Sequence, residues 1–266
     1  MRRFSTAVAV LSVALGVAAL AAVIAVDSWQ RQEIQRLTAE FAPDVLVLRY
    51  ADQWPDDVVA EPGESFGISF EEAMSLSGVD GVLAVGYHGS GGRVLGGQLS
   101  LQRVAVSATI FEVLGFDFAA GAGFTDTARQ LDLPVVVLGA SAAEELFGGA
   151  QAAVGQTVDL GMGVARVEGV LAPVPGDVAE FQYFNIAALV PAGGSFDFFT
   201  TRRPAATRVF VRHEEGAAER TAAGLRVALK ELPTGRGYEV VGPETWLGSQ
   251  RVFRNRVADE LTEGIK

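Results

Sequence analysis

The hydrophobic pattern of the chain begins with one long apolar segment. Two arginines at positions 2 and 3 precede 23 uncharged residues, from Phe4 to Val26, and Asp27 ends the run. As a helix this run would be about 35 Å long, roughly the thickness of the hydrocarbon core of a bilayer. The pattern predicts a transmembrane anchor over residues 1–26. By the positive-inside rule, the N-terminus is expected in the cytoplasm and the rest of the chain outside.

A cleavable signal peptide is the alternative reading of this segment. The apolar region of a signal peptide is about 7–15 residues long, which is shorter than this run. Ala19-Leu20-Ala21 would serve as a cleavage site. The polar segment that follows is itself typical of a helix, which favours an uncleaved anchor.

Residues 27–43 predict a stalk helix that continues the anchor. Ile34, Leu37 and Phe41 fall on one helical face, and Pro43 ends the pattern. Such a stalk would raise the following domain by about 24 Å. We expect its apolar face to pack against another helix, because a stalk has little else to bury against.

The body of the chain, residues 44–243, shows the mixed periodicity of an α+β fold. Strands are expected at 45–49, 81–87, 93–95, 99–107, 134–138, 156–160, 164–171, 187–190, 208–212 and 238–241, and helices at 69–78, 107–115, 141–148 and 214–232. The order β-α-β, then a strand-rich middle, then β-α-β predicts a β-rich insertion at roughly 100–200. Residues 244–266 indicate a second, charged stalk helix that is cut short.

Local signals sharpen several of these elements. Ser69 with Glu72, and Ser141 with Glu144, have the spacing of capping boxes that open helices. The glycine-rich stretch 88–92 predicts a turn between two short strands. The β-branched run 134–138 predicts a strand that is buried on both faces.

Composition narrows the classes of function. The net charge of −11 argues against nucleic acid as a partner and against adsorption to anionic lipid. The absence of cysteine excludes thiolate nucleophiles and thiolate metal sites. The chain has only two histidines, His88 and His213, so few side chains can transfer protons near neutral pH. We expect both in turns or at the surface.

The sharpest enzyme signal lies around Ser141. A strand, a tight turn with this serine and a helix resemble a hydrolase nucleophile elbow, and residues 88–92 resemble an oxyanion loop. The elbow needs glycine two residues after the serine, where this chain has Ala143, and His213 is the only downstream base. A helix cap is the favoured role of Ser141. Neither a phosphate-binding P-loop nor metal-ligand spacing is found, so no catalytic, cofactor-binding or metal-binding residue is predicted.

Two longer strings carry a resemblance to a known family. VAVSATIFEVLGFDFAAGAGFTD (104–126) and PVVVLGASAAEELFGGAQAAVGQTVDLGMGVARVEGVLAPV (134–174) are similar, in order and spacing, to the periplasmic core domain of MacB-like ABC transporter permeases. These are relatives of the macrolide exporter and of lipoprotein-release permeases. The resemblance runs from residue 1 to about residue 243, and no single motif within it is diagnostic.

The resemblance implies a fold and a set of partners. It implies a βαβ-type subdomain formed by both ends of the domain, with a β-rich subdomain inserted between them. It implies a cytoplasmic ABC ATPase subunit, a homodimer or heterodimer of permeases in the bacterial inner membrane, and a periplasmic adaptor. It also implies mechanotransmission, in which ATP hydrolysis moves the stalks and so the outer domain, with no catalytic residue in the permease part and no cofactor. Family members continue into three further spans, so this chain is expected to be a fragment.

Three hypotheses about function follow. The first is the extracytoplasmic domain of an ABC-type exporter or mechanotransmission permease, which couples ATP hydrolysis inside to work outside. The second is a stand-alone membrane-anchored binding or adaptor domain. The third, disfavoured by the residues around Ser141, is an anchored serine hydrolase.

Overall fold

The structure is a computed structural model. It describes residues 44–50, 67–96, 99–161, 163–174, 183–193 and 206–242, together with the single residues Ala25 and Thr245. The predicted anchor, stalk and second stalk lie outside the described residues apart from those two positions. Within the described ranges, no helix is long and apolar enough to cross a bilayer.

Ten strands of the described chain form one mixed sheet. They are β1 (Val45–Tyr50), β2 (Val82–Gly96), β3 (Leu99–Val106), β4 (Phe118–Gly121), β5 (Val135–Leu138), β6 (Thr157–Asp159), β7 (Val164–Leu171), β8 (Ala187–Pro191), β9 (Ala206–His213) and β10 (Tyr238–Val241). The order is β10-β1-β9-β2-β3-β8-β5-β7-β4, and β6 pairs with β7 off this path. Only the pairs β3–β8 and β5–β7 are parallel in the part described. The predicted α+β class is confirmed.

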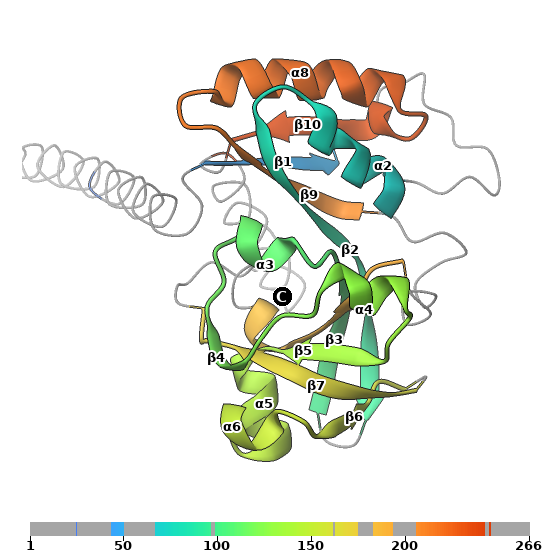
Figure 1. Cartoon of the computed structure of the whole chain (residues 1–266), viewed down its shortest axis with the longest axis vertical. Coiled ribbons are helices and arrows are strands. Elements are labelled where there is room, and N and C mark those ends of the chain that lie inside the picture. Colours follow the sequence, from blue (N-terminus) through green and yellow to red (C-terminus); the bar gives the residue numbers. More distant parts are fainter. Residues whose placement is uncertain are drawn as a thin grey trace, which may run out of the picture.

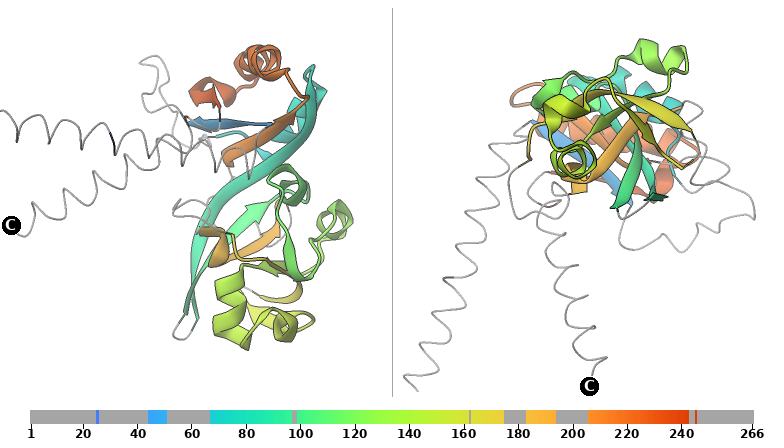
Figure 2. Two further views of the ribbon diagram at one scale, coloured as in Figure 1. Left: turned by 90° about the vertical axis from the view of Figure 1, so that its left-hand side faces the viewer. Right: turned by 90° about the horizontal axis from the view of Figure 1, so that it is seen from below.

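Helices lie at both ends of this sheet and between the ends (Figure 1). They are α2 (Phe70–Ser75), α3 (Ile110–Val113), α4 (Asp126–Gln130), α5 (Ala140–Phe147), α6 (Ala150–Ala153) and α8 (Ala218–Glu231), with the 3-10 turns η1 (Leu76–Gly78) and η3 (Gly235–Gly237). Helices α3 and α4 are those between the ends. Strands β10, β1 and β9 lie with α8 and α2, which we call the α8 end (Figure 1). Strands β3 to β8 lie with α5 and α6, which we call the α5 end. Strand β2 passes from one end to the other (Figure 2).

The long strand β2 corrects the sequence prediction. Residues 81–87 and 93–95 were expected as two strands with a turn at 88–92, but the strand runs unbroken for 15 residues. It pairs with β9 from Val82 to Gly89 and with β3 from His88 to Gly96, and both ladders shift register at His88. A Cβ on Gly89 would lie 2.9 Å from the ring of Tyr87. Glycine here therefore permits close approach within a bulged strand and does not indicate a turn.

Apolar side chains are buried on both faces of the sheet. In β1, Leu46 and Leu48 face the core that contains α8 and α5, whereas Val45 and Val47 face the core that contains α3. All four residues of β5 are buried, which confirms the prediction of a strand covered on both faces. Two-sided burial holds the strands in a single register, because a slip of one residue would exchange the two faces.

The first predicted capping box is present and also joins two distant segments. The hydroxyl of Ser69 accepts from the amide of Glu72 at 3.2 Å, and the Glu72 carboxylate accepts from the Ser69 amide at 2.8 Å. The same carboxylate accepts from the hydroxyl of Thr234 at 3.0 Å. Glu72 therefore caps α2 and ties it to the turn between α8 and β10.

Helix α8 confirms its predicted apolar face and adds one polar exception. Ala222, Leu225 and Leu229 are buried as expected. Thr221 is fully buried, and its hydroxyl has no hydrogen-bond partner among the described residues. A buried hydroxyl without a partner carries an uncompensated desolvation cost.

Replacing Thr221 with valine is therefore expected to stabilise the protein by about 1 kcal/mol, because the shape is kept and the unpaired hydroxyl is removed. Urea unfolding of the whole chain in detergent measures this. Thr221→Ser, which keeps the hydroxyl and loses the methyl group, is the control and should be less stable than the parent. A valine variant no more stable than the parent would contradict the reading.

Candidate functional site: a groove between α2 and α4

A groove of about 480 Å³ lies between α2 and α4. Its lining comes from three segments: Phe70, Glu71 and Met74 of α2, the loop 107–109 after β3, and Asp126 and Arg129 of α4. Helix α2 belongs to the α8 end, and α4 connects β4 and β5 of the α5 end (Figure 1). The groove therefore lies where the two ends of the sheet meet.

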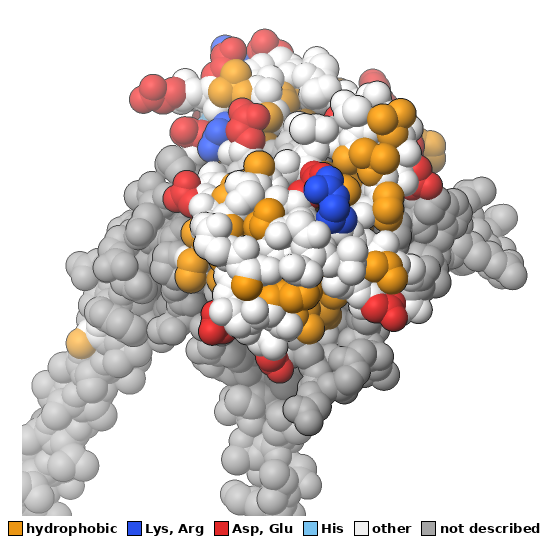
Figure 3. Space-filling model, turned by 60° about the horizontal axis from the view of Figure 1, so that its bottom comes forward, with side chains coloured by type: hydrophobic (Ala, Val, Ile, Leu, Met, Phe, Trp, Pro, Cys, Tyr) orange, Lys and Arg blue, Asp and Glu red, His pale blue; other side chains and the backbone are white. Residues whose placement is uncertain are grey.

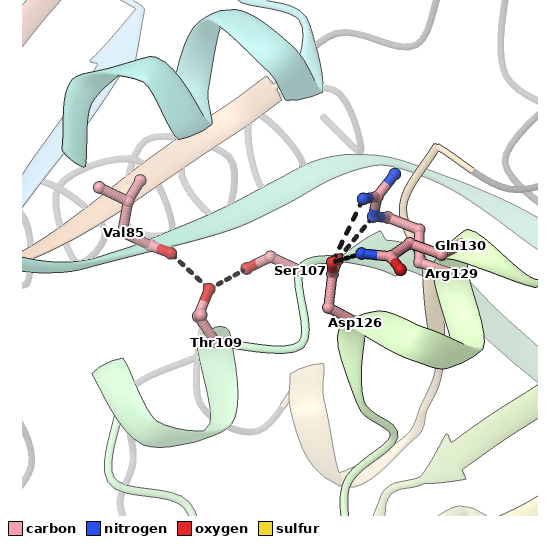
Figure 4. A network of polar contacts seen from close by, with 6 residues as sticks. All are labelled: Val85, Ser107, Thr109, Asp126, Arg129 and Gln130. Carbon is pink, nitrogen blue, oxygen red and sulfur yellow. Dashed lines mark hydrogen bonds and ion pairs between the residues drawn. The ribbon is translucent and has the colours of Figure 1, made fainter. Parts of the chain in front are cut away.

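A chain of hydrogen bonds forms one side of the groove (Figure 4). The amide of Tyr87 donates to the Ser107 hydroxyl at 2.9 Å, and the Thr109 hydroxyl donates to the carbonyl of Val85. The two hydroxyl oxygens are 2.9 Å apart. Because the proton of Thr109 goes to Val85, Ser107 is the donor between them. Residues 107–109 thus continue along β2 beyond the end of β3.

The helix expected at 107–115 begins later than predicted, and Ser107, the first residue of that range, does not cap it. Helix α3 begins after Thr109, and that residue makes no side-chain cap hydrogen bond. The Ser107 hydroxyl bonds to β2 instead, and the backbone amide of Ser107 donates to the Tyr87 carbonyl at 3.1 Å. The side chain joins two segments across the groove wall and does not close a helix terminus.

Arg129 connects the two walls of the groove. Its Nε donates to Asp126 Oδ1 at 2.7 Å and its Nη2 to Oδ2 at 3.3 Å, while the Gln130 amide donates to Oδ2 at 2.7 Å (Figure 4). The Arg129 guanidinium lies 5.0 Å from the ring centroid of Phe70. The Phe70 ring in turn meets Tyr87 edge to face, with centroids 5.4 Å apart. The cation is thus held by a carboxylate from its own helix and an aromatic face from α2.

Asp126 and Arg129 stabilise each other in their ionised forms. The hydrogen bond from Arg129 lowers the pKa of Asp126, against a smaller opposing effect of burial. The same hydrogen bond raises the pKa of Arg129, and the charge of Glu71 contributes in the same direction. Two carboxylates and one guanidinium leave the groove with an excess of one negative charge.

Both histidines lie in strands, and each is only 5% exposed, so their predicted place in turns or at the surface is wrong. The His88 ring lies among those of Tyr183, Phe184 and Phe210, with centroids 6.3, 5.7 and 6.4 Å away. Burial, followed by the positive charge of Arg208, lowers the pKa of His88 to about 3. His88 is therefore neutral in the folded protein at ordinary pH.

The structure separates the residues of the hydrolase hypothesis. The strand-turn-helix layout around Ser141 is present, but Gly139 is the N-cap of α5, so the predicted second capping box is wrong. The Ser141 side chain is exposed, and within the described residues no hydrogen bond joins it to His88 or His213. His213 ends β9 at the α8 end, while α5 lies at the other end (Figure 1). The described residues also contain no group of three or more acidic or histidine side chains placed to hold a metal ion.

No groove residue was singled out from the sequence as part of a site. Helix α4, like β4 and α6, was not predicted, because five residues are too few for a periodic pattern. The one local signal is the spacing of Asp126 and Arg129, an i,i+3 pair of opposite charge. Phe70 lies inside the first capping box, and only Ser69 and Glu72 of that box were given a role from the sequence.

A second surface feature follows α4 directly. Leu131, Leu133 and Val164 are 65%, 41% and 55% exposed. Leu131 and Leu133 lie between α4 and β5, and Val164 begins β7, the parallel neighbour of β5. Hydrophobic side chains are visible among uncharged surface on the face drawn in Figure 3. The α5 end thus carries exposed apolar groups on the segment that leaves α4 and at the start of β7.

Comparison with known proteins adds three findings. The model of the family described as MacB-like periplasmic core domain matches residues 6–227. The macrolide export ATP-binding/permease protein MacB of Hyphomonas neptunium is 29% identical over 171 residues, which make up 63% of this chain and 26% of that protein. The chain therefore spans about a quarter of the length of this curated relative.

Two solved structures share the fold. The periplasmic region of MacB from Actinobacillus actinomycetemcomitans superposes with a TM-score of 0.60 at 16% identity, over 81% of this chain and 96% of that one. The extracellular domain of the noncanonic ABC-type transporter YknZ from Gram-positive bacteria gives 0.57 at 20% identity, over 74% of this chain and 100% of that one.

Proposed function

Since the chain belongs to the MacB-like periplasmic core domain family, we propose that it is the extracytoplasmic part of a permease subunit of an ABC-type exporter or mechanotransmission complex. The observation that carries the proposal is the family match over residues 6–227, which begins inside the apolar N-terminal run and extends into α8. In this role the chain itself catalyses nothing. It transmits movement or position from the membrane to the outer domain.

The proposal assigns a part to each segment. Residues 1–26 anchor the chain in the bacterial inner membrane, with the N-terminus in the cytoplasm. Residues 27–43 and 244–266 are the two stalks that flank the core domain, residues 44–243. Within the core, the α8 end is a βαβ-type subdomain next to the stalks, and the α5 end is the β-rich insertion. This division is supported by the sheet order, in which β1, β9 and β10 are neighbours although β3 to β8 lie between β1 and β9 in sequence.

The proposed partners follow from the same assignment. A cytoplasmic ABC ATPase would supply the energy, and a second permease subunit, identical or related, would complete the membrane part. A periplasmic adaptor would meet the outer domain. The curated relative carries both ATP-binding and permease in its name, which supports this pairing.

Co-purification from native membranes tests the proposal. The whole chain, isolated in mild detergent, is expected to bring with it a protein that hydrolyses ATP, in comparable amount. The control is a variant whose residues 1–26 are replaced by an unrelated transmembrane helix, which should lose most of this partner if the anchor packs within the membrane part. Recovery of the chain with an envelope protein and no ATPase would instead support the stand-alone adaptor hypothesis.

A further inference from the structure

The positively charged side chain of Arg129 lines the groove between α2 and α4. The guanidinium of Arg129 lies over the ring of Phe70 and is gripped by both oxygens of Asp126. Gly193, with φ of +77°, lies in the turn after β8 and packs against the same two side chains: a Cβ built there would be 3.7 Å from Phe70 and 3.9 Å from Arg129. Three segments that are distant in sequence therefore meet at the Arg129 side chain.

We propose that Arg129 is a latch that holds α4 of the α5 end against α2 of the α8 end, and that the groove widens when this contact is released. The contact between Arg129 and Phe70 joins two particular side chains and is weak enough to be released. The side chains of Arg129 and Asp126 are 28% and 54% exposed, so water competes for both partners. A cation over a ring at a partly exposed site changes an equilibrium by about two- to fivefold.

The surroundings of Arg129 allow such a movement. The two ends of the sheet share both apolar cores, and the continuous backbone of β2 and the hydroxyls of Ser107 and Thr109 join them on the side of the groove away from the latch. The groove of about 480 Å³ lies between α4 and α2, and α4 is a helix outside the sheet, so the proposed widening separates two helices and no paired strands. Glu71 of α2 attracts the same guanidinium, which favours the closed arrangement.

Distance measurement between two spin labels tests the latch. The chain has no cysteine, so Ser75→Cys on α2 and Thr127→Cys on α4, both exposed, introduce unique labelling sites in the full chain in lipid nanodiscs. The parent is expected to give one main distance. Arg129→Ala should raise the fraction at longer distance about two- to fivefold. Phe70→Leu, which keeps an apolar side chain, should give the same shift.

Two further variants make the test specific. Combining Arg129→Ala with Phe70→Leu should add little to either change alone, because both remove one contact. Arg166→Ala is the matched control: this arginine is 59% exposed and is paired with Glu168 at 2.7 Å, away from the groove, so the distance should not change. Superposable distributions for Arg129→Ala and the parent, or an equal shift in the Arg166 control, would overturn the latch.

The latch does not depend on the proposed function. The measurement needs neither an ATPase nor a transported molecule. A failed latch would leave the assignment as a permease domain intact, and a failed assignment would leave the distances unchanged.

Discussion

Replacing Gly139 with alanine is expected to destabilise the protein by roughly 3 kcal/mol or more, a large fraction of the stability of a typical domain. The backbone at Gly139 has ordinary angles, φ −72° and ψ 158°, so its conformation does not require glycine. The space around it does. A Cβ there would lie 2.0 Å from the carbonyl oxygen of Phe184 and 2.4 Å from that of Asn185.

Backbone atoms cannot rotate away from this clash as a flexible side chain could. The amide of Gly139 also donates to the carbonyl of Ala187 at 2.8 Å, so β5 and β8 cannot separate without losing a bond inside the sheet. Urea unfolding of the full chain in detergent, or its yield in membranes, measures the loss. Gly78→Ala is the control, because nothing lies within 4 Å of a Cβ there, and its stability should stay within about 0.5 kcal/mol of the parent. Equal stabilities of the two variants would show that the close approach is not real.

Lowering the pH from 7 to 5 is expected to cost the folded protein about 2 kcal/mol through His88 alone. Burial and the charge of Arg208 lower the pKa of His88 from 6.5 to about 3. Below pH 6.5 the unfolded chain therefore takes up a proton that the folded chain does not accept until the pH approaches 3. The stabilisation is complete above pH 6.5 and is lost through this window as the pH falls.

The free energy of unfolding of the parent and of His88→Gln, measured at pH 7 and pH 5, isolates this contribution. Glutamine does not titrate, so the variant should lose less stability than the parent over the same interval, by about 2 kcal/mol. Carboxylates affect both proteins alike and cancel in the comparison. An identical loss in both would mean that His88 is not buried as a neutral ring.

The sequence predicted the elements whose pattern is local. Three predicted features each depend on residues close together in sequence, and the structure has all three. They are the apolar run at 134–138, the spacing of Ala222, Leu225 and Leu229 in α8, and the capping box of Ser69. Strand β2 was divided wrongly, because glycine-rich sequence is typical of turns. Only the position of Tyr87 beside Gly89 shows that glycine here makes room for a ring.

The groove could not be predicted in the same way. Phe70 and Arg129 are neighbours only because α4, too short to have a periodic pattern, folds back toward α2. The same limit explains Ser107, whose hydroxyl has the sequence context of a helix cap and bonds to β2. It also explains His88, whose burial results from aromatic rings of β9 and of the segment before β8. Each of these roles depends on contacts between segments that are distant in sequence.

Accessibility of one introduced cysteine tests the central claim most directly, namely that this domain is held outside the cell membrane by an uncleaved N-terminal helix. Ser77→Cys places a unique thiol at an exposed position next to α2. In intact spheroplasts, a maleimide that cannot cross membranes is expected to label the full-length chain, and the labelled chain should sediment with the membranes. Labelling only after lysis, or recovery of a soluble chain shortened by its first two dozen residues, would contradict the account.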